Sequence, residues 1–227
     1  MNKLSAFVKL DFITIKPYFT AKYILVYVAV AVLTTTISKN TATGIFVGMM
    51  LGTMAASYPF SIGEKSNMDA LYATLSLSRK NVVLGRYLFM LAFNICTVIF
   101  SLATSSAGLF ISKLANMQIS AYEGFIVIML ILIVYCIVFQ SIQLPIFFKL
   151  GYAKAKFFRM LPAIIIMISF YALNMAYTSI GAAGADNLFA AAADNIGVIS
   201  AVVALLMVLI VFVSIKLSFV FYNKREF

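Results

Sequence analysis

The chain has 227 residues, of which 64% are hydrophobic and 11% are charged, and its mean hydropathy is +1.06. A soluble domain has about 45–50% apolar and about 25% charged residues, and a core of this length could not hide the excess apolar surface. These values exclude a cytosolic enzyme, a disordered chain and a disulfide scaffold, and they indicate a membrane protein. The net charge of +10 would suggest nucleic-acid binding in a soluble protein, so the positions of the charges must decide its meaning.

Several kinds of site are excluded by residue types that the chain lacks. It contains no histidine, which excludes Ser-His-Asp and Cys-His nucleophilic sites and histidine-based metal sites. It has no GxxxxGK[ST] loop, so it cannot cradle nucleotide phosphates in the P-loop manner. Cys96 and Cys136 lie in apolar runs and are expected to be free thiols. We therefore expect no catalytic, metal or cofactor site on this chain.

Six apolar segments are long enough to cross a bilayer core of roughly 30 Å. They predict an all-α, polytopic membrane protein with one transmembrane domain over residues 1–227. The predicted spans are residues 23–38, 43–62, 84–111, 122–148, 158–180 and 196–221. With six spans, both termini lie on the same side of the membrane.

The basic residues indicate which side that is. All but two of the 17 Lys and Arg residues lie before the first span, after the last span, in the loops between spans two and three and between spans four and five, or within the span ends that adjoin these regions. The exceptions are Lys39 and Lys113. By the positive-inside rule, both termini and the two basic loops are cytoplasmic. Membrane orientation thus explains the basic surplus, and we expect no nucleic-acid partner.

The predicted spans contain few strongly polar side chains. No Asp, Glu, Lys or Arg lies in the middle third of any span, which weakens the case for an ion-coupled transporter. The strongest polar groups are four amides, which either hydrogen-bond between helices or line part of a translocation path. They are Asn94, Gln140, Gln143 and Asn174.

Small residues recur at every fourth position of the second predicted span, at Gly44, Gly48, Gly52 and Ala56. Residues four apart share a helix face, so they form a continuous stripe that another backbone can approach closely. The stripe predicts packing within the chain or against a second membrane subunit. The alternative is a smooth wall that faces a transported substrate.

The predicted cytoplasmic loop at residues 63–82 contains a short amphipathic helix. Ser66 followed by Asp69 is a capping-box pattern, which begins a helix. An apolar face then follows at helical spacing, at Met68, Leu71, Tyr72 and Leu75. Ser78 is the predicted N-cap of the helix that continues into the third span. The apolar face needs a partner, which is either the lipid surface or a cytoplasmic protein.

Three runs of this sequence resemble those of type-2 ABC exporter permeases, in particular the small six-span permeases of the staphylococcal phenol-soluble-modulin exporter. The first run is the loop, with matches at Glu64-Lys65, Asp69, Leu75, Ser78-Arg79-Lys80 and Leu84-Gly85-Arg86-Tyr87. The others are residues 145–151 (PIFFKLG) and 222–227 (YNKREF). The chain departs from the pattern at Leu77, where proline or valine is common, and at Met68, where an aromatic residue is common.

The resemblance implies roles for several segments. Residues 1–17 would be an interfacial helix, although Asp11 interrupts its apolar stripe. Residues 66–77 would be a coupling helix seated on an ATPase, residues 149–157 a second contact with it, and residues 181–196 short extracellular re-entrant helices. The residues expected at the ATPase-docking surface are Glu64, Met68, Asp69, Leu71, Tyr72, Leu75, Arg79, Lys149 and Tyr152.

The resemblance also implies a working unit in the bacterial cytoplasmic membrane. Two permeases, identical or related, would pair with two separate ATPase chains that bind ATP and magnesium. The 21 Phe and 12 Met residues and the few fixed charges favour an amphipathic cargo, and the relatives suggest membrane-active peptides. The alternatives are the substrate-binding membrane subunit of an energised vitamin importer and a passive channel or structural membrane protein.

Overall fold

The computed structural model describes residues 3–38, 41–66, 68, 71–72, 78–114, 125–161, 164–165, 168, 175 and 196–224. All regular secondary structure in this part of the chain is helical. The elements are α1 (Lys3–Ile15), the short 3-10 helix η1 (Lys16–Tyr18), α2 (Ala21–Ser38), α3 (Thr41–Ala55), α4 (Tyr58–Lys65), α6 (Arg79–Leu114), α7 (Phe125–Ala155), η2 (Lys156–Arg159) and α10 (Ile196–Asn223).

Five of the described segments are long and apolar enough to cross a membrane. They are Ala21–Ser38, Thr43–Lys65, Arg79–Leu114, Ile131–Phe158 and Ser200–Asn223. They overlap five of the six predicted spans. The predicted span at 158–180 lies largely outside the described residues, and so does the predicted re-entrant segment at 181–196.

The second span is divided into two helices, although the sequence predicts one segment over residues 43–62. α3 ends at Ala55, and α4 begins at Tyr58 with Pro59 in its first turn. Proline suits a helix start because its missing N–H would have no intrahelical partner there. The break turns α4 toward α7, where the Phe60 ring lies 5.2 Å from the rings of Phe147 and Phe148.

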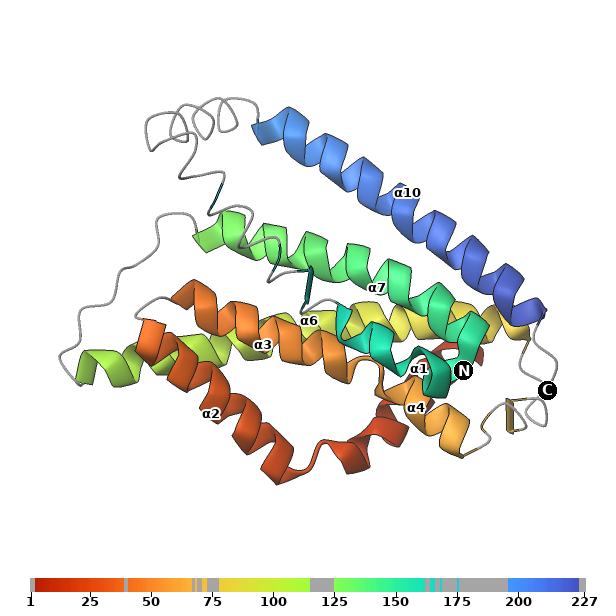
Figure 1. The fold of residues 1–227 in the computed structure, drawn as a ribbon, viewed down its shortest axis with the longest axis horizontal. Helices are drawn as coiled ribbons and strands as arrows, with labels where there is room; N and C mark the ends of the chain where they lie inside the picture. Colours follow the sequence, from red (N-terminus) through yellow and green to blue (C-terminus); the bar gives the residue numbers. More distant parts are fainter. Residues whose placement is uncertain are drawn as a thin grey trace.

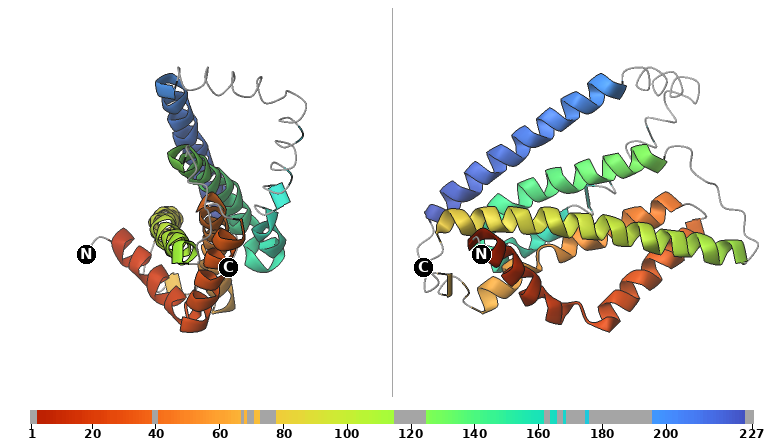
Figure 2. Two further views of the ribbon diagram at one scale, coloured as in Figure 1. Left: turned by 90° about the vertical axis from the view of Figure 1, so that its left-hand side faces the viewer. Right: turned by 180° about the vertical axis from the view of Figure 1, so that it is seen from behind.

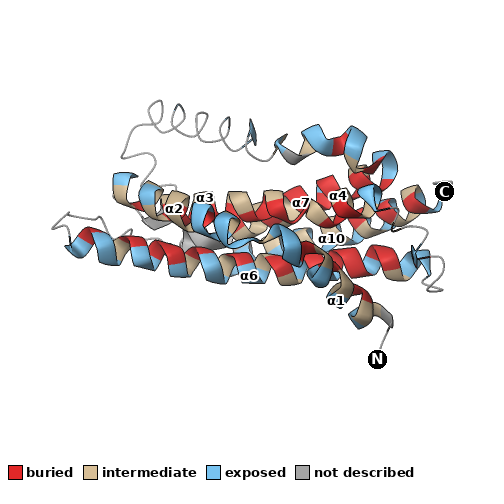
Figure 3. Ribbon diagram, turned by 90° about the horizontal axis from the view of Figure 1, so that it is seen from below, coloured by how far each residue is buried: buried red, intermediate tan, exposed pale blue. Residues whose placement is uncertain are grey.

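The longest helix, α6, runs the length of the bundle (Figure 1). Its 36 residues extend about 54 Å. The predicted N-cap is confirmed, because the Ser78 hydroxyl accepts a hydrogen bond from the Asn81 backbone N–H at 3.3 Å. Buried residues follow one side of α6 (Figure 3), and α1, α2, α3 and α10 pack against this helix. It is therefore the surface on which most of the other elements pack.

One end of the bundle is densely packed. Its core includes Phe7, Tyr72, Val83, Phe148 and Tyr222, which come from α1, the residues before α6, α6 itself, α7 and α10. We call this the junction end. The N-terminal helix and the C-terminal end of α10 both lie there, whereas α10 and α7 diverge toward the opposite end (Figures 1 and 2). The surface of α10 is almost wholly apolar and exposed, as expected of a helix that meets lipid or another membrane helix.

Candidate functional site

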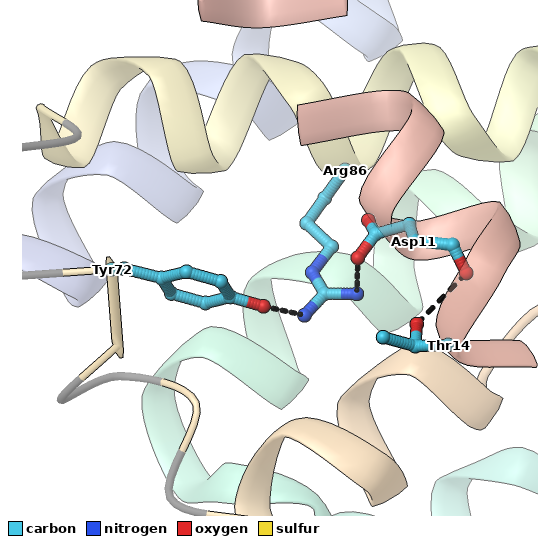
Figure 4. A network of polar contacts seen from close by, with 4 residues as sticks. All are labelled: Asp11, Thr14, Tyr72 and Arg86. Atoms are coloured by element: carbon cyan, nitrogen blue, oxygen red, sulfur yellow. Dashed lines mark hydrogen bonds and ion pairs between the residues drawn. The ribbon is translucent and has the colours of Figure 1, made fainter. Parts of the chain in front are cut away.

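An ion pair is buried at the junction end between α1 and α6. The two helices approach closely at Gly85, where a Cβ atom would overlap the Phe7 ring. This contact brings Asp11 of α1 to Arg86 of α6, with Arg86 Nη1 2.8 Å from Asp11 Oδ1 (Figure 4). The two side chains are only 1% and 5% exposed. Charges are rarely buried this deeply unless they are paired, so the pair fixes how α1 lies on α6.

Arg86 also joins two further segments to this pair. Its Nη2 donates a hydrogen bond to the Tyr72 hydroxyl at 3.0 Å (Figure 4). Its guanidinium carbon lies 5.5 Å from the centre of the Phe7 ring and 4.9 Å from that of Phe60, within cation–π range. One side chain of α6 thus contacts α1, α4 and the residues that precede α6.

Burial sets the charge state of Asp11. It raises the pKa of this carboxyl from 3.8 to about 6, although the neighbouring Arg86 guanidinium opposes the rise. Among the described residues, Asp11 Oδ2 has no hydrogen-bond partner. Asp11 is therefore mostly ionised at neutral pH and becomes protonated in mild acid.

Glu64, at the end of α4, holds the segment that follows the fourth predicted span. Its Oε2 accepts hydrogen bonds from the backbone N–H groups of Tyr152, at 2.5 Å, and Ala153, at 3.1 Å. The chain reaches this position by turning at Gly151, whose φ of 74° lies in the left-handed region that favours glycine. The two predicted docking loops are thereby joined, because Glu64 belongs to one and Tyr152 to the other.

Polar contacts also bind α10 to α6 and α7. The Tyr87 hydroxyl lies 2.5 Å from Ser214 Oγ and 2.8 Å from Ser218 Oγ, and Ser214 donates to the Ser141 carbonyl at 2.5 Å. Arg79 Nη1, at the start of α6, donates to the Asn223 carbonyl at 2.6 Å. The end of α10 therefore lies beside the start of α6.

A family model of ABC-2 family transporter proteins matches residues 6–223 of the chain. The chain belongs to the ABC-2 transporter family. Comparison with curated proteins and with solved structures gives no match. Membership of the family implies a multi-pass membrane protein with a partner ATPase, and this agrees with the apolar helices of the bundle.

The predicted coupling helix of this ABC-2 permease presents its apolar residues in two directions. Met68, Leu71 and Tyr72 are helical, whereas Asp69 and Leu75 lie outside the described residues. Tyr72 is 4% exposed and packs against Phe7, with the ring centres 5.2 Å apart. Leu71 is 40% exposed. Of these side chains, Leu71 is therefore the one on the surface, while Tyr72 belongs to the permease's own core.

Two further residues predicted for ATPase docking contact α10. Arg79 bonds its last carbonyls, as described above, and Lys149 Nζ lies 5.1 Å from the centre of the Phe221 ring. Both residues are also exposed. Their contacts within the permease do not test a docking role, which stays a prediction.

The predicted polar residues of the spans hydrogen-bond between helices where the structure describes them. Asn94 of α6 and Gln140 of α7 exchange reciprocal amide hydrogen bonds of 2.6 and 2.9 Å. Gln143 Nε2 donates to the Phe158 carbonyl at 2.8 Å, while its buried Oε1 has no partner among the described residues. Asn174 lies outside the described residues.

The stripe of small residues packs within the chain. A Cβ atom on Gly44 would overlap Thr35 of α2, and one on Gly52 would overlap Thr97 of α6. A Cβ atom on Gly48 would lie 2.6 Å from Ser101 Oγ. Ala56 is fully buried at the break between α3 and α4. The three glycines therefore allow α3 to lie directly against α2 and α6.

Sequence reasoning missed the buried ion pair. In the sequence, Arg86 is recognisable only as a basic residue and a motif position, and Asp11 only as an interruption of an apolar stripe. That interruption was a usable signal, because an acidic residue on the buried face of a helix requires a partner. The motif residue Arg86 was a candidate partner, although no local pattern joins positions 75 residues apart.

Proposed function

We propose that this chain is the permease subunit of an ATP-driven exporter and works with a separate ATPase that binds ATP and magnesium. The match to the ABC-2 family over residues 6–223 supports the transporter class. The chain itself hydrolyses no ATP in this proposal, since its sequence has no P-loop. Two permease copies, or two related permeases, complete the working unit in the bacterial cytoplasmic membrane, with both termini in the cytoplasm.

The contacts of Arg86 carry the mechanistic part of the proposal. The partner ATPase docks on the surface that includes Leu71, and the adjacent Tyr72 transmits its movement through the hydroxyl bonded to Arg86. Arg86 is part of α6 and pairs with Asp11 of α1, so both helices move with the docked segment. Glu64 extends the same movement to the end of α7.

The docking step is tested with a pair of substitutions at Leu71. Leu71→Asp places a charge on the docking surface and should abolish co-purification with the ATPase, whereas Leu71→Met keeps the apolar contact and should retain it. Both variants should elute and unfold as the wild type does, because Leu71 is exposed. Co-purification of the Leu71→Asp variant at the wild-type level would contradict the docking site.

The transmission step is tested separately with Tyr72→Phe. This variant keeps the ring packed on Phe7 but removes the hydroxyl that accepts the Arg86 hydrogen bond. We expect ATPase binding to persist while cargo-stimulated ATP hydrolysis falls. An unchanged stimulated rate would show that the hydroxyl transmits nothing.

We further propose that the cargo is an amphipathic, membrane-active peptide. The described spans carry few charges, and their Asn94 and Gln140 amides bond each other, which suits a cargo with a large apolar face. The test is ATP hydrolysis by the reconstituted complex with added amphipathic helical peptides. Stimulation by a lipid or a small apolar drug, with none by the peptides, would overturn the cargo assignment.

A further inference from the structure

An apolar pocket lies between α2, α3 and α6 at the level where α2 begins. Its volume is about 250 Å³, and its walls include the aromatic rings of Phe19, Tyr23, Tyr27, Phe93 and Phe100. Three of its lining residues, Ile24, Cys96 and Phe100, are exposed, so the pocket reaches the surface of the bundle. That surface is the side of membrane-spanning helices, where lipid is the solvent.

The lining offers an occupant almost only apolar contact. The Tyr27 hydroxyl donates to the Gly48 carbonyl at 2.6 Å and lies 2.9 Å from Ser101 Oγ. The Thr97 hydroxyl donates to the Phe93 carbonyl at 2.9 Å. These polar groups are satisfied within the protein, so nothing about them requires a polar ligand. The volume is also below the roughly 300–1,000 Å³ of pockets for drug-sized ligands, which favours a slender apolar chain.

The charges near this pocket favour an anion at its mouth. Lys16 and Lys22 are exposed and flank Phe19, one of the walls, in sequence. The acidic side chains in the described part of the junction end are engaged elsewhere, since Asp11 pairs with Arg86 and Glu64 accepts backbone N–H groups. A lysine near the headgroup region attracts anionic lipid.

We propose that the pocket holds an acyl chain of an anionic phospholipid, with its headgroup at Lys16 and Lys22. One lipid molecule then accounts for both the apolar pocket and the nearby lysines. Its acyl chain packs against the aromatic rings of the pocket, and its negatively charged headgroup contacts the lysines near the start of α2. The site is independent of the ATPase and of the cargo, and it would be occupied in the permease alone.

The chain contains no tryptophan, so one introduced indole can report on the pocket. Phe100→Trp places it in the pocket wall. Ile99→Trp is the matched control, because Ile99 is the preceding residue of α6, is 61% exposed and is not part of the wall. Each variant is reconstituted in phosphatidylcholine vesicles that contain a minor fraction of phosphatidylglycerol with brominated acyl chains, which quench tryptophan fluorescence on contact.

We expect the brominated anionic lipid to quench Phe100→Trp well beyond its share of the bilayer, and Ile99→Trp only in proportion to it. With bromine on the same fraction of phosphatidylcholine instead, the excess should disappear. Two lysines at the headgroup correspond to a preference for the anionic lipid of roughly thirtyfold. Adding Lys16→Gln and Lys22→Gln to Phe100→Trp should remove the preference.

Equal quenching at the two positions would overturn the proposal. Equal quenching by the two headgroups, or an excess that survives the loss of both lysines, would overturn it as well. A pocket filled by a segment of a second chain would leave Phe100→Trp unquenched by either lipid and would overturn it too. Phe93→Trp, in another part of the same wall, provides the measurement if the first variant does not fold.

Discussion

Arg86 is a cation enclosed by two aromatic rings, and its removal leaves a buried acid without its partner. We expect Arg86→Met to destabilise the permease by about 3–5 kcal/mol at pH 7.5, because the buried Asp11 must then either remain an unpaired charge or take up a proton. Asp11→Asn should recover part of that loss in the double variant, with a coupling energy of about 1–3 kcal/mol. Thermal unfolding in detergent, followed by circular dichroism, measures all three variants.

Arg79→Met is the control for this double-mutant cycle. Arg79 lies seven residues earlier on the same helix, is exposed, and donates hydrogen bonds to carbonyl groups of α10. Its loss should cost under about 1.5 kcal/mol. If the two arginine variants were equally destabilised, or if the two effects at Asp11 and Arg86 were additive, the buried pair would have no special role.

The raised pKa of Asp11 predicts the pH dependence of stability. The native state holds the Asp11 proton up to about pH 6, whereas the unfolded chain releases it near 3.8. The native state therefore binds more protons in this window, and the stability due to Asp11 is greatest at the acid end and is lost as the pH rises to about 6. Relative to Asp11→Asn, the wild type should gain stability on acidification from pH 7 to 4.5, by at most about 1.4 kcal/mol per pH unit.

The sign of the stability difference between the wild type and Asp11→Asn in acid distinguishes two electrostatic causes. Unfolding temperatures of the two proteins, measured side by side across the range, remove the effect of every other titrating group that they share. A wild type that loses stability relative to Asp11→Asn in acid would mean that the attraction of Arg86 outweighs the cost of burial. The pKa of Asp11 would then lie below 3.8 rather than above it.

At the level of elements, α3 depends on glycine for its contact with α6. The three nearest atoms to a Cβ on Gly52 all belong to Thr97, so Gly52→Ala forces the two helices apart. Overpacking of this kind costs about 1–3 kcal/mol. Thr97→Ala should rescue the variant in large part, because it removes the two nearest atoms while losing only a hydroxyl bonded within its own helix.

Gly197→Ala is the matched control for a glycine in a helix. Among the described residues, no atom outside its own helix backbone and chain neighbours lies within 4 Å of a Cβ at Gly197, so this substitution should be neutral or stabilising by up to about 1 kcal/mol, the helix preference of alanine over glycine. Unfolding in detergent compares the variants. A destabilised Gly197→Ala, or a neutral Gly52→Ala, would show that helix contact does not set the effect.

The elements that the sequence predicted best are those with the strongest local signals. The span at Arg79–Leu114 combines a long apolar run with a serine N-cap, and both features are local. The break at residues 56–57 was not predicted, because the position of Pro59 is compatible with either a helix end or a bend. The pairing of Asp11 with Arg86 was also missed, since it depends on how α1 lies on α6 and not on any pattern within either helix.

Across the whole molecule, contacts at the junction end indicate how the chain is threaded. The hydrogen bond that the Tyr152 N–H donates to Glu64 places the end of α7 there. The hydrogen bond that Arg79 donates to the Asn223 carbonyl places the end of α10 there as well. α10 therefore begins at the opposite end, about 42 Å away for its 28 residues. This arrangement supports the prediction that the chain crosses the membrane once more between residues 159 and 195.

That crossing and the orientation can be tested together with single cysteines, after Cys96 and Cys136 are replaced by alanine. Lys113→Cys and Asp194→Cys lie in predicted external loops and should react with a membrane-impermeant maleimide in intact cells. Lys154→Cys and Lys224→Cys lie on the predicted cytoplasmic side and should react only after permeabilisation. The distribution of basic residues requires this pattern. If Lys154→Cys and Asp194→Cys reacted under the same condition, the chain would not cross the membrane between them, and the six-span topology would be wrong.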